Sequence, residues 1–465
     1  MAREPGLALI VTVHDALVQL LGPGKVSAAE EILSAHASDR WHASSPPEVV
    51  IFAETTADIV GVMQFAHERR IPVTTRGAGV GYVGGCVPQH GGIALSLARM
   101  NTILELNPGD GLAVVQPGVI TADLQSAARK IGWYYPPDPA SLKECSLGGN
   151  IATNAGGPRC LKYGVTRPYV LGLEVVLANG TVLRCGSRCH KNKTGFDLVG
   201  LFVGSEGMLG VVTQATLRLI PHPQARAMLT ATFPEFRQAA HAVQQILNSG
   251  HLPSALEITD GFTLQAARDY LGPNALPAGD AHLIVEIDGR TQAVESERHE
   301  LAGLMEELGA LATEHHIDEE ACEKVWQLRR DFSYSLRNTG LTKLNEDIVV
   351  PRSKLLDLVE FAREMQERTG IAIACFGHAG DGNIHTNLMV KDYENPEVQA
   401  EADNALDELF RWIIKEGGVI TGEHGVGLAK KRWFADAVGE EAVSAHAALK
   451  LAMDPRGILN PGKFL

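Results

Sequence analysis

Two histidines flank a turn sequence in the segment Gly377-His-Ala-Gly-Asp-Gly-Asn-Ile-His385. Its central Asp-Gly pair is preferred in two-residue type I′ turns, and with that turn His378 pairs directly with His385. Directly opposed residues share one face of a hairpin, with Cβ atoms about 4.5–5.5 Å apart. Both imidazoles and the Asn383 amide are therefore predicted to point the same way. Two imidazoles at that separation can bind one divalent cation.

A third ligand is needed, and Glu423 is the candidate, in the glycine-flanked segment Thr421-Gly-Glu-His-Gly-Val-Gly427. His424 follows it directly. An isolated histidine pair beside a turn is more often exposed or hydrogen-bonded in a core than bound to a metal, so the pattern alone leaves both interpretations open. Two histidines and a carboxylate suit zinc, our first choice, but also manganese or iron.

Glycine supplies 48 of the 465 residues, and many glycines gather in three segments, at 76–85, 146–157 and 204–210. Backbone N–H groups in such loops can surround a diphosphate because no Cβ blocks the approach. The first loop lacks the spacing and the following helix of a Rossmann fingerprint. Alone it is equally compatible with a turn between strands. Three such loops at strand ends together indicate one large, extended, anionic ligand.

Alternating strand and helix patterns must position these motifs. Apolar runs at 49–53 and 71–75 flank a helical pattern at 56–70, which predicts a βαβ unit leading into the first glycine loop. A capping box, Ser27-Ala-Ala-Glu30, predicts an earlier helix. Asn179-Gly180 predicts a hairpin between 173–178 and 181–184. Further strands are expected at 93–97, 113–116, 210–220, 228–233, 282–287 and 371–376, and helices at 122–131, 236–248, 291–311, 319–336, 353–367 and within 404–451.

Specific runs carry a family resemblance: Pro72–Gly81, Pro136-Pro-Asp-Pro139, Leu147–Gly157, Gly204-Ser-Glu-Gly207, Gly377–His385, Gly422-Glu-His-Gly425 and Leu459-Asn-Pro-Gly-Lys463. Together they resemble the FAD-linked oxidases of the vanillyl-alcohol oxidase superfamily, a family that includes D-lactate dehydrogenases, D-2-hydroxyglutarate dehydrogenases and the D subunit of glycolate oxidase. The resemblance extends from about Pro46 to the C-terminus. It implies an α+β, two-domain flavoprotein with a PCMH-type FAD-binding domain, an α+β substrate domain and a C-terminal helical segment that packs back on the FAD domain.

The implied domains are an N-terminal helical segment (1–45), the FAD-binding domain (46–223), the substrate and metal domain (224–410) and a C-terminal helical segment that completes the active site (411–465). Non-covalent FAD is expected because the loop 76–85 contains neither His nor Cys. Val80 and Met208 stand where the family often has Thr, which removes two possible hydroxyl contacts but no backbone contact. The residues implied to contact FAD are Arg76, Gly77, Ala78, Gly79, Val80, Gly81, Pro137, Leu147, Gly148, Gly149, Ala152, Thr153, Asn154, Gly156, Gly157, Tyr163, Gly164, Glu206, Gly207, Gly210 and Asn460.

The resemblance also assigns the chemistry. It implies that His378, His385 and Glu423 bind a divalent metal, that His424 is the catalytic base, and that Arg329 and Lys343 bind a substrate carboxylate. Asn383 completes the catalytic group, and Arg330 is a rival to Lys343. The implied reaction is oxidation of a small D-2-hydroxy acid (D-lactate, glycolate or D-2-hydroxyglutarate class) to the 2-oxo acid, by metal-assisted proton abstraction and hydride transfer to flavin N5. The alternative is a flavin-carrying subunit of a larger electron-transfer complex such as glycolate oxidase.

Composition limits the partners. With 55 acidic and 41 basic residues the net charge is −14, which argues against general affinity for nucleic acid or anionic membranes. The seven cysteines have no disulfide or iron–sulfur spacing, which favours reduced thiols in the cytoplasm. Electrons must therefore leave to a quinone, an electron-transfer flavoprotein, an iron–sulfur partner subunit or oxygen. The apolar run Leu7–Val13 is too short for a signal peptide or membrane span. We expect a cytoplasmic protein, peripheral to a membrane only through a partner, with homodimer formation open.

Overall fold

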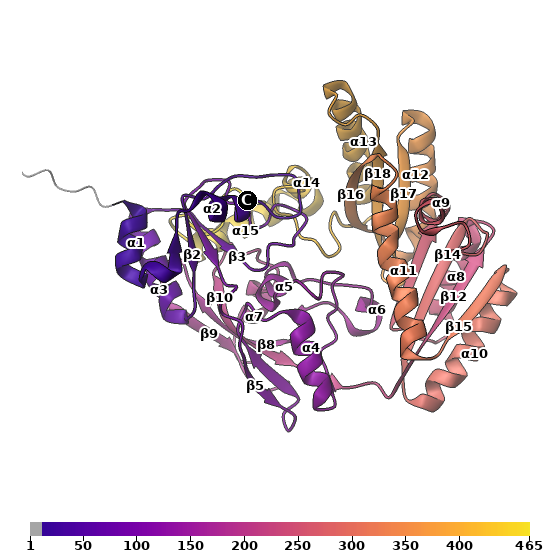
Figure 1. Ribbon diagram of the computed structural model, residues 1–465, viewed down its shortest axis with the longest axis horizontal. Coiled ribbons are helices and arrows are strands. Elements are labelled where there is room, and N and C mark those ends of the chain that lie inside the picture. The colour runs from indigo at the N-terminus through magenta and orange to yellow at the C-terminus, as the bar shows by residue number, and fades with distance from the viewer. Residues whose placement is uncertain (1–11) are drawn as a thin grey trace, which may run out of the picture.

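Three large β-sheets, one two-stranded sheet and packed helices organise residues 12–465 of the computed structural model, which are the residues that the structure describes (Figure 1). The apolar run at 7–13 therefore lies largely outside the described residues. Two sheets occupy the N-terminal half of the chain, and the third and largest occupies most of the remainder. The mixed helix and sheet content and the two-part arrangement confirm the predicted α+β class.

The first sheet has the strand order β1 (Val26–Ser27), β2 (Val49–Phe52), β4 (Ile93–Ser96), β3 (Val73–Arg76). Strands β2 and β3 both run parallel to β4, and α3 (Thr56–Arg69) connects them, as the predicted βαβ unit requires. The side chain of Thr55 caps α3 in a capping box with Asp58. Strand β3 runs directly into the first glycine loop.

The predicted capping box at Ser27 is wrong. Ser27 belongs to β1, and its backbone pairs with Val50 of β2. Helix α2 (Glu30–Ala35) begins after Ala29 and has no side-chain cap. Ser27 pairs with another strand instead of capping the helix, and a local sequence motif cannot predict such pairing. Helix α1 (Val13–Leu21) and the 3₁₀ turn η1 (Pro23–Lys25) complete this end of the fold.

The second sheet is antiparallel and has the order β5 (Ile103–Asn107), β6 (Leu112–Val115), β10 (Val211–Arg218), β8 (Val170–Val176), β9 (Val182–Gly186). The predicted hairpin at Asn179-Gly180 forms, with Val176 paired to Val182. The accompanying elements are α4 (Thr121–Lys130), α5 (Leu147–Thr153), α6 (Cys160–Tyr163), η2 (Arg167–Tyr169), α7 (Leu198–Phe202) and a small pair of β7 (Trp133–Tyr134) with β11 (Ile220–Pro221). The second and third glycine loops lie around α5 and after α7.

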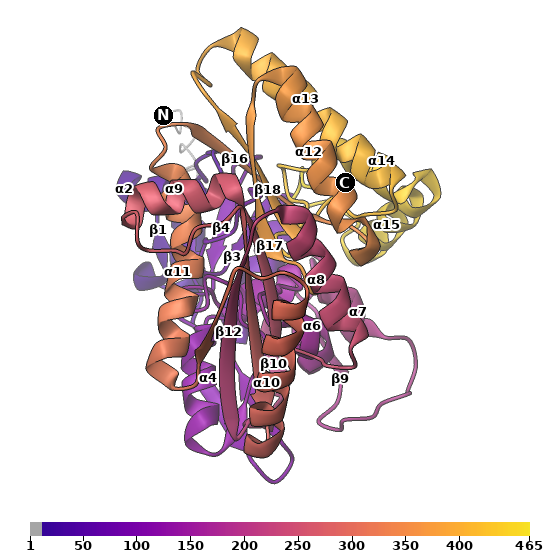
Figure 2. The same ribbon diagram turned by 90° about the vertical axis from the view of Figure 1, so that its right-hand side faces the viewer.

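The third sheet is antiparallel throughout and has the order β15 (Ala312–His316), β12 (Ala225–Phe233), β14 (Ala281–Gly289), β13 (Ala255–Asp260), β17 (Ala372–His378), β18 (Asn383–Val390), β16 (Thr342–Val349). One face packs an apolar core against α8 (Phe236–Asn248), α10 (Thr291–Glu307), α12 (Leu355–Thr369) and α13 (Pro396–Lys415). Helices α9 (Gly261–Leu271) and α11 (Glu319–Arg337) pack on the opposite face (Figure 2). The 3₁₀ turn η3 (Arg352–Lys354) precedes α12.

Strand β18 has one face in the apolar core and an opposite face that carries polar side chains. Both of its faces are buried, but its residues alternate in character. Ile384 and Leu388 join the apolar core. Asn383 and His385 lie on the opposite face of the strand from this core. The strand therefore presents polar side chains where solvent is already largely excluded.

The C-terminal segment returns to the first sheet, as predicted. Helices α14 (Lys431–Val438) and α15 (Glu440–Met453) lie beside the N-terminal part of the chain in Figure 1. Leu459 forms a parallel bridge with Val73, and the Lys450 ammonium donates to the carbonyl of Met208. The connection 416–430 thus passes from the third sheet to the FAD-binding domain. None of the helices in residues 12–465 combines the length and apolar character that crossing a membrane requires.

Candidate active site and metal centre

The histidine hairpin forms, but with a different register from the predicted one. His378 pairs with Asn383, and His385 pairs with Phe376, so the connection has four residues, 379–382. The reason is tertiary, because the backbone N–H of Gly380 donates to Leu256 of the neighbouring strand β13. The direct pairing of His378 with His385 was therefore wrong. The histidines occupy diagonal positions on the same face, with ring centroids 5.6 Å apart.

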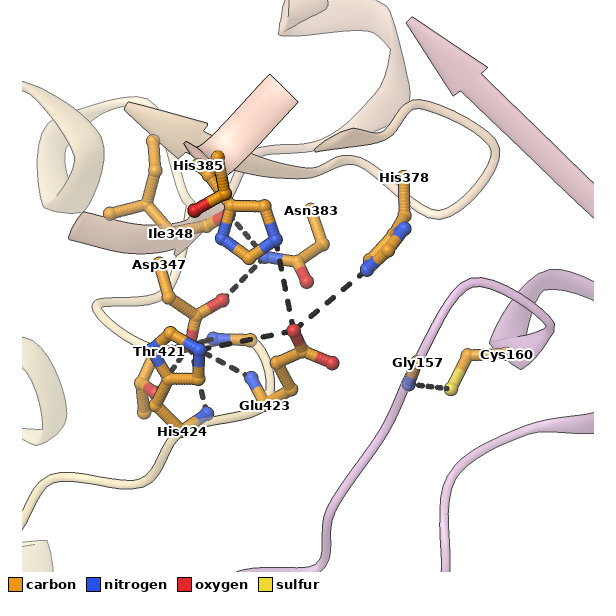
Figure 3. A network of polar contacts seen from close by, with 12 residues as sticks. Gly157, Cys160, Asp347, Ile348, His378, Asn383, His385, Thr421, Glu423 and His424 are labelled. Atoms are coloured by element: carbon orange, nitrogen blue, oxygen red, sulfur yellow. Dashed lines mark hydrogen bonds and ion pairs between the residues drawn. The ribbon is translucent and has the colours of Figure 1, made fainter. Parts of the chain in front are cut away.

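Glu423 projects between the two histidines (Figure 3). Its Oε1 lies 3.8 Å from Nε2 of His378 and 3.7 Å from Nε2 of His385. One ligand atom from each of the three residues falls within a 4.8 Å group, the only such group of three among residues 12–465. The hairpin and the loop 421–427, which is distant in sequence, thus bring the three predicted ligands together.

A carboxylate that sequence reasoning missed orients His378. Glu257 on β13 accepts a hydrogen bond from Nδ1 of His378 at 2.5 Å and another from Nε of Arg329 at 2.6 Å. Burial alone raises the pKa of Glu257, but the charges of His378 and Arg329 lower it to about 2. Burial opposes charge on His378, and the adjacent Glu257 nevertheless raises its pKa well above the usual value. The bond to Nδ1 leaves Nε2 directed at Glu423, the arrangement typical of a metal-binding histidine.

A second missed carboxylate, Asp347 on β16, holds the loop that carries Glu423. Its Oδ2 accepts the backbone N–H groups of Gly422, Glu423 and His424, each at 2.9 Å, and the Thr421 hydroxyl at 3.0 Å. The other oxygen accepts the Asn383 amide at 2.7 Å. Burial raises the pKa of Asp347, but the nearby His424 and Lys430 charges and these donors hold it well below its usual range. Asp347 is therefore an anionic anchor for the loop.

The geometry and chemistry of this group fit a divalent cation. The ring of His385 is buried, its Nδ1 has no hydrogen-bond partner within the described part of the chain, and its Nε2 lies 3.7 Å from Oε1 of Glu423. Burial and the neighbouring His378 lower its pKa well below the usual value, which keeps the imidazole neutral. Two imidazoles and one carboxylate are a donor set for zinc, manganese or iron, and a bound cation would take the place of the proton on Nε2 of His378.

His424 lies beside the ligand group without joining it. Its Nε2 is 3.9 Å from Oε1 of Glu423, and its ring stacks with that of Tyr82 from the first glycine loop, with centroids 5.3 Å apart. Nδ1 lies 3.8 Å from the Asp347 carboxylate. The residue is thus positioned from both domains. Sequence reasoning did not assign Tyr82, which lies inside the loop that it did identify.

The predicted carboxylate-binding residues lie close to the ring of Phe376. The Arg329 guanidinium is 4.7 Å from the Phe376 ring centroid and the Lys343 ammonium 5.6 Å. Lys343 donates to the Ser333 hydroxyl, and burial, with Arg337 and Arg329 nearby, lowers its pKa to about 7. Arg330, the rival, also lines the cavity but is bonded to Gln327. Asn383 donates to Asp347 and to the Ile348 carbonyl, so its amide is used to brace the site.

One cavity of about 1540 Å³ joins these residues to the glycine loops. Among the residues predicted to contact FAD, those lining it are Gly77, Ala78, Gly79, Val80, Gly81, Gly148, Gly149, Ala152, Thr153, Gly156, Glu206, Gly207 and Gly210. Within residues 12–465 no backbone N–H of the stretch 77–81 has a protein acceptor, which suits a phosphate-binding loop. The cavity also reaches His378, His385, Glu423 and His424. Its size, extent and free donors fit an extended dinucleotide next to the metal group.

The remaining predicted FAD contacts do not line the cavity, and most have structural partners. The Arg76 guanidinium donates to the Ser38 carbonyl, Leu147 is buried in the core, and Asn154 accepts from the backbone of Arg167. Tyr163 donates to Asp288, and Asn460 donates to the carbonyls of Gly85 and Glu206. Pro137 accepts from Gln125, while Gly157 donates to the sulfur of Cys160 and Gly164 ends α6. These residues support the cavity wall from behind and do not line the cavity.

Comparisons with known proteins agree with this architecture. A family profile described as "FAD linked oxidases, C-terminal domain" matches residues 222–464, and one described as "FAD binding domain" matches residues 47–186. The chain is 38% identical over 455 residues to the glycolate oxidase subunit GlcD of Bacillus subtilis, covering 97% of this chain and 96% of the relative. It is 32% identical to the D-lactate dehydrogenase of Anaerostipes hadrus, covering 96% and 95%.

Solved structures extend the likeness to the fold. The chain superimposes on p-cresol methylhydroxylase with a TM-score of 0.79 at 21% identity, over 96% of this chain and 95% of the other. Alkyldihydroxyacetonephosphate synthase gives a TM-score of 0.74 at 20% identity, over 96% and 84%. At these identities the likeness concerns the fold alone, and it confirms the PCMH type of the FAD-binding domain.

Proposed function

Because the chain belongs to the FAD-linked oxidase family, we propose that it oxidises a small D-2-hydroxy acid, of the lactate, glycolate or 2-hydroxyglutarate class, to the 2-oxo acid. Bound FAD supplies a hydride acceptor, and a bound divalent cation supplies a Lewis acid that makes an alcohol more acidic. One observation carries the proposal: the glycine loops, the His378–His385–Glu423 group, His424 and the Arg329–Lys343 pair all line a single cavity.

The residues have distinct tasks in this proposal. His424 accepts the proton of the substrate hydroxyl, as a positioned imidazole can. The terminal nitrogens of Arg329 and the Lys343 ammonium bind the substrate carboxylate and so orient Cα. His378, His385 and Glu423 would hold the cation, with zinc the first choice and manganese or iron also suited. Glu257 and Asp347 act through these groups, as positioning residues.

A second function, that of the flavin-carrying subunit in a larger electron-transfer complex, is favoured by the relatives named as glycolate oxidase subunits. The two proposals are compatible, because the metal ligands, the base and the carboxylate-binding residues are all present in this chain. In such a complex this chain would be the subunit that oxidises the hydroxy acid. A quinone, an electron-transfer flavoprotein or an iron–sulfur partner subunit would then accept the electrons.

The adjacent residues Glu423 and His424 give the sharpest test. Glu423→Ala should lose metal as well as rate, because it removes a ligand. His424→Ala should keep metal and FAD and lose mainly kcat, by about 10²–10⁴-fold for a positioned general base. Elemental analysis beside steady-state dye reduction, over a panel of D- and L-2-hydroxy acids, measures both effects. A metal-free His424 variant with a metal-replete Glu423 variant reverses the roles, and no turnover with any hydroxy acid overturns the function.

A further inference from the structure

The loop that carries Glu423 and His424 is fastened to the FAD-binding domain by a buried carboxylate. Glu206, in the third glycine loop, accepts the backbone N–H of Val426 at 2.7 Å with one oxygen and that of Gly427 at 2.9 Å with the other. Its relative exposure is 8%, so water does not compete for these bonds. The contact with FAD that the resemblance implies for Glu206 is therefore assigned to its backbone, because its side chain binds the loop that carries Glu423 and His424.

Two further contacts join the same loop to the first glycine loop. The Val83 carbonyl accepts the backbone N–H of Leu428 at 2.7 Å, and a Cβ at Gly427 would lie 2.2 Å from that carbonyl oxygen. Tyr82 stacks on His424. Thus the segment 423–428 is packed directly against two of the three loops that line the cavity. It cannot shift relative to them without breaking bonds or creating overlap.

The backbone of Glu206 is itself part of the cavity wall. Its φ is +49°, a left-handed conformation that is costly for a residue with a side chain. Its N–H donates to the Ala152 carbonyl at 2.8 Å, and its carbonyl accepts the Asn460 amide at 2.7 Å. Ala152 belongs to the second glycine region. A ligand that fixes these loops therefore also fixes the two acceptor oxygens offered to Val426 and Gly427.

We propose that FAD and the divalent cation bind with positive thermodynamic coupling, and that the Glu206 carboxylate is the positioning residue that transmits it. The inference rests on the metal site of the proposed function. A cation fixes Glu423, which is only three residues from Val426, and so holds the loop against Glu206. Order imposed at one site lowers the ordering cost at the other, and such coupling is reciprocal. Metal should thus tighten FAD binding without touching FAD.

The test measures the FAD dissociation constant of the holoenzyme, from flavin fluorescence recovered on dilution, with Zn²⁺ or Mn²⁺ present and after chelation. In the wild type, removing metal should weaken FAD binding by about 5-fold or more, the lower end of typical coupling. Glu206→Ala should bring that ratio close to 1. Glu206→Gln, which keeps the shape and one acceptor oxygen, should give an intermediate ratio and guards against a folding defect in the alanine variant.

Lys162→Met is the matched control. Lys162 joins the two domains through Asp288 at 2.6 Å but does not contact the loop 421–428. It should keep the wild-type ratio, so a loss there would attribute the coupling to general loosening between the domains and overturn the role of Glu206. A wild-type ratio of 1 with metal demonstrably bound refutes the coupling alone. A holoenzyme that binds neither Zn²⁺ nor Mn²⁺ in equilibrium dialysis refutes the metal site and the coupling together.

Discussion

Replacing Asp347 by Asn should loosen the loop 421–427, which carries Glu423. The wild-type carboxylate is fully buried and accepts from five donors, four of them on Oδ2. An amide has one oxygen, so it can face either the loop or Asn383 but not both. Whichever way it turns, its NH₂ group meets at least one donor that is already buried. The change also removes the negative charge that faces the Lys430 ammonium at 4.0 Å.

The size of the effect follows from these contacts. A hydrogen bond to a charged group contributes about 1.5–3 kcal/mol, and a buried donor left unpaired costs about 1–3 kcal/mol. One of each gives an expected loss of about 2.5–6 kcal/mol in the free energy of unfolding. Metal affinity should fall by about 10–100-fold, as when other partners that orient a ligand are removed. FAD binding should weaken only through the proposed coupling to the metal, because Asp347 does not itself line the cavity.

Chemical denaturation and metal titration of Asp347→Asn measure both quantities. Asp381→Asn is the matched control, since that carboxyl lies in the hairpin that carries the two histidines and, within residues 12–465, accepts only one backbone N–H, at 3.3 Å. It should lose no more than about 1 kcal/mol, the value of one ordinary hydrogen bond. If Asp347→Asn is as stable as the wild type and binds metal equally well, the carboxylate does not anchor the loop and the reasoning fails.

Three further outcomes are expected. Since the pKa of Lys343 is lowered to about 7, its ammonium loses charge as pH rises through that value, and KM for the hydroxy acid should increase above that pH. Lys343→Met should raise KM at low pH and abolish its further increase with pH. If this variant keeps the wild-type pH profile, Lys343 does not bind the substrate. His378→Ala, and chelation of the wild type, should remove metal and weaken FAD binding by the proposed coupling without abolishing it, because the hairpin belongs to the third sheet; complete loss of FAD in concentrated protein would contradict this separation. Acid precipitation should leave the flavin in the supernatant, since the loop 76–85 offers no attachment residue, and a yellow pellet would show a covalent link.

Local motifs predicted the cavity well because glycine loops act through their own backbones. Gly77 needs no distant partner to present its N–H group or to admit a ligand, so its place in the cavity wall can be predicted from spacing. The hairpin register could not be read in the same way. Its Asp-Gly pair favours a two-residue turn, but the bond from Gly380 to Leu256 selects a longer connection. The local preference for a two-residue turn is overridden by this tertiary hydrogen bond, which is of comparable strength.

Glu257 and Asp347 escaped sequence reasoning for another physical reason. Each is a charged residue in the interior of a strand, and its partners are far away in the chain: His378 lies 121 residues beyond Glu257, and Glu423 lies 76 residues beyond Asp347. Sequence spacing says nothing about such pairs. The available signal was the charge itself, because a carboxylate inside a strand of a two-sided sheet must be buried and therefore needs strong partners. Such positions are candidates for a site before their partners are known.

The same requirement explains why the loop 421–427 can be precise without regular structure. A loop with free backbone N–H groups is costly to bury, and here buried carboxylates accept them. Asp347 from the third sheet takes the N–H groups of residues 422–424, and Glu206 from the FAD-binding domain takes those of 426 and 427. Each of the two carboxylates fixes the loop relative to a different domain. Glu423 can then face the histidines of the sheet while His424, one residue later, faces Tyr82 of the glycine loop, which places a candidate ligand and a candidate base side by side at the domain boundary.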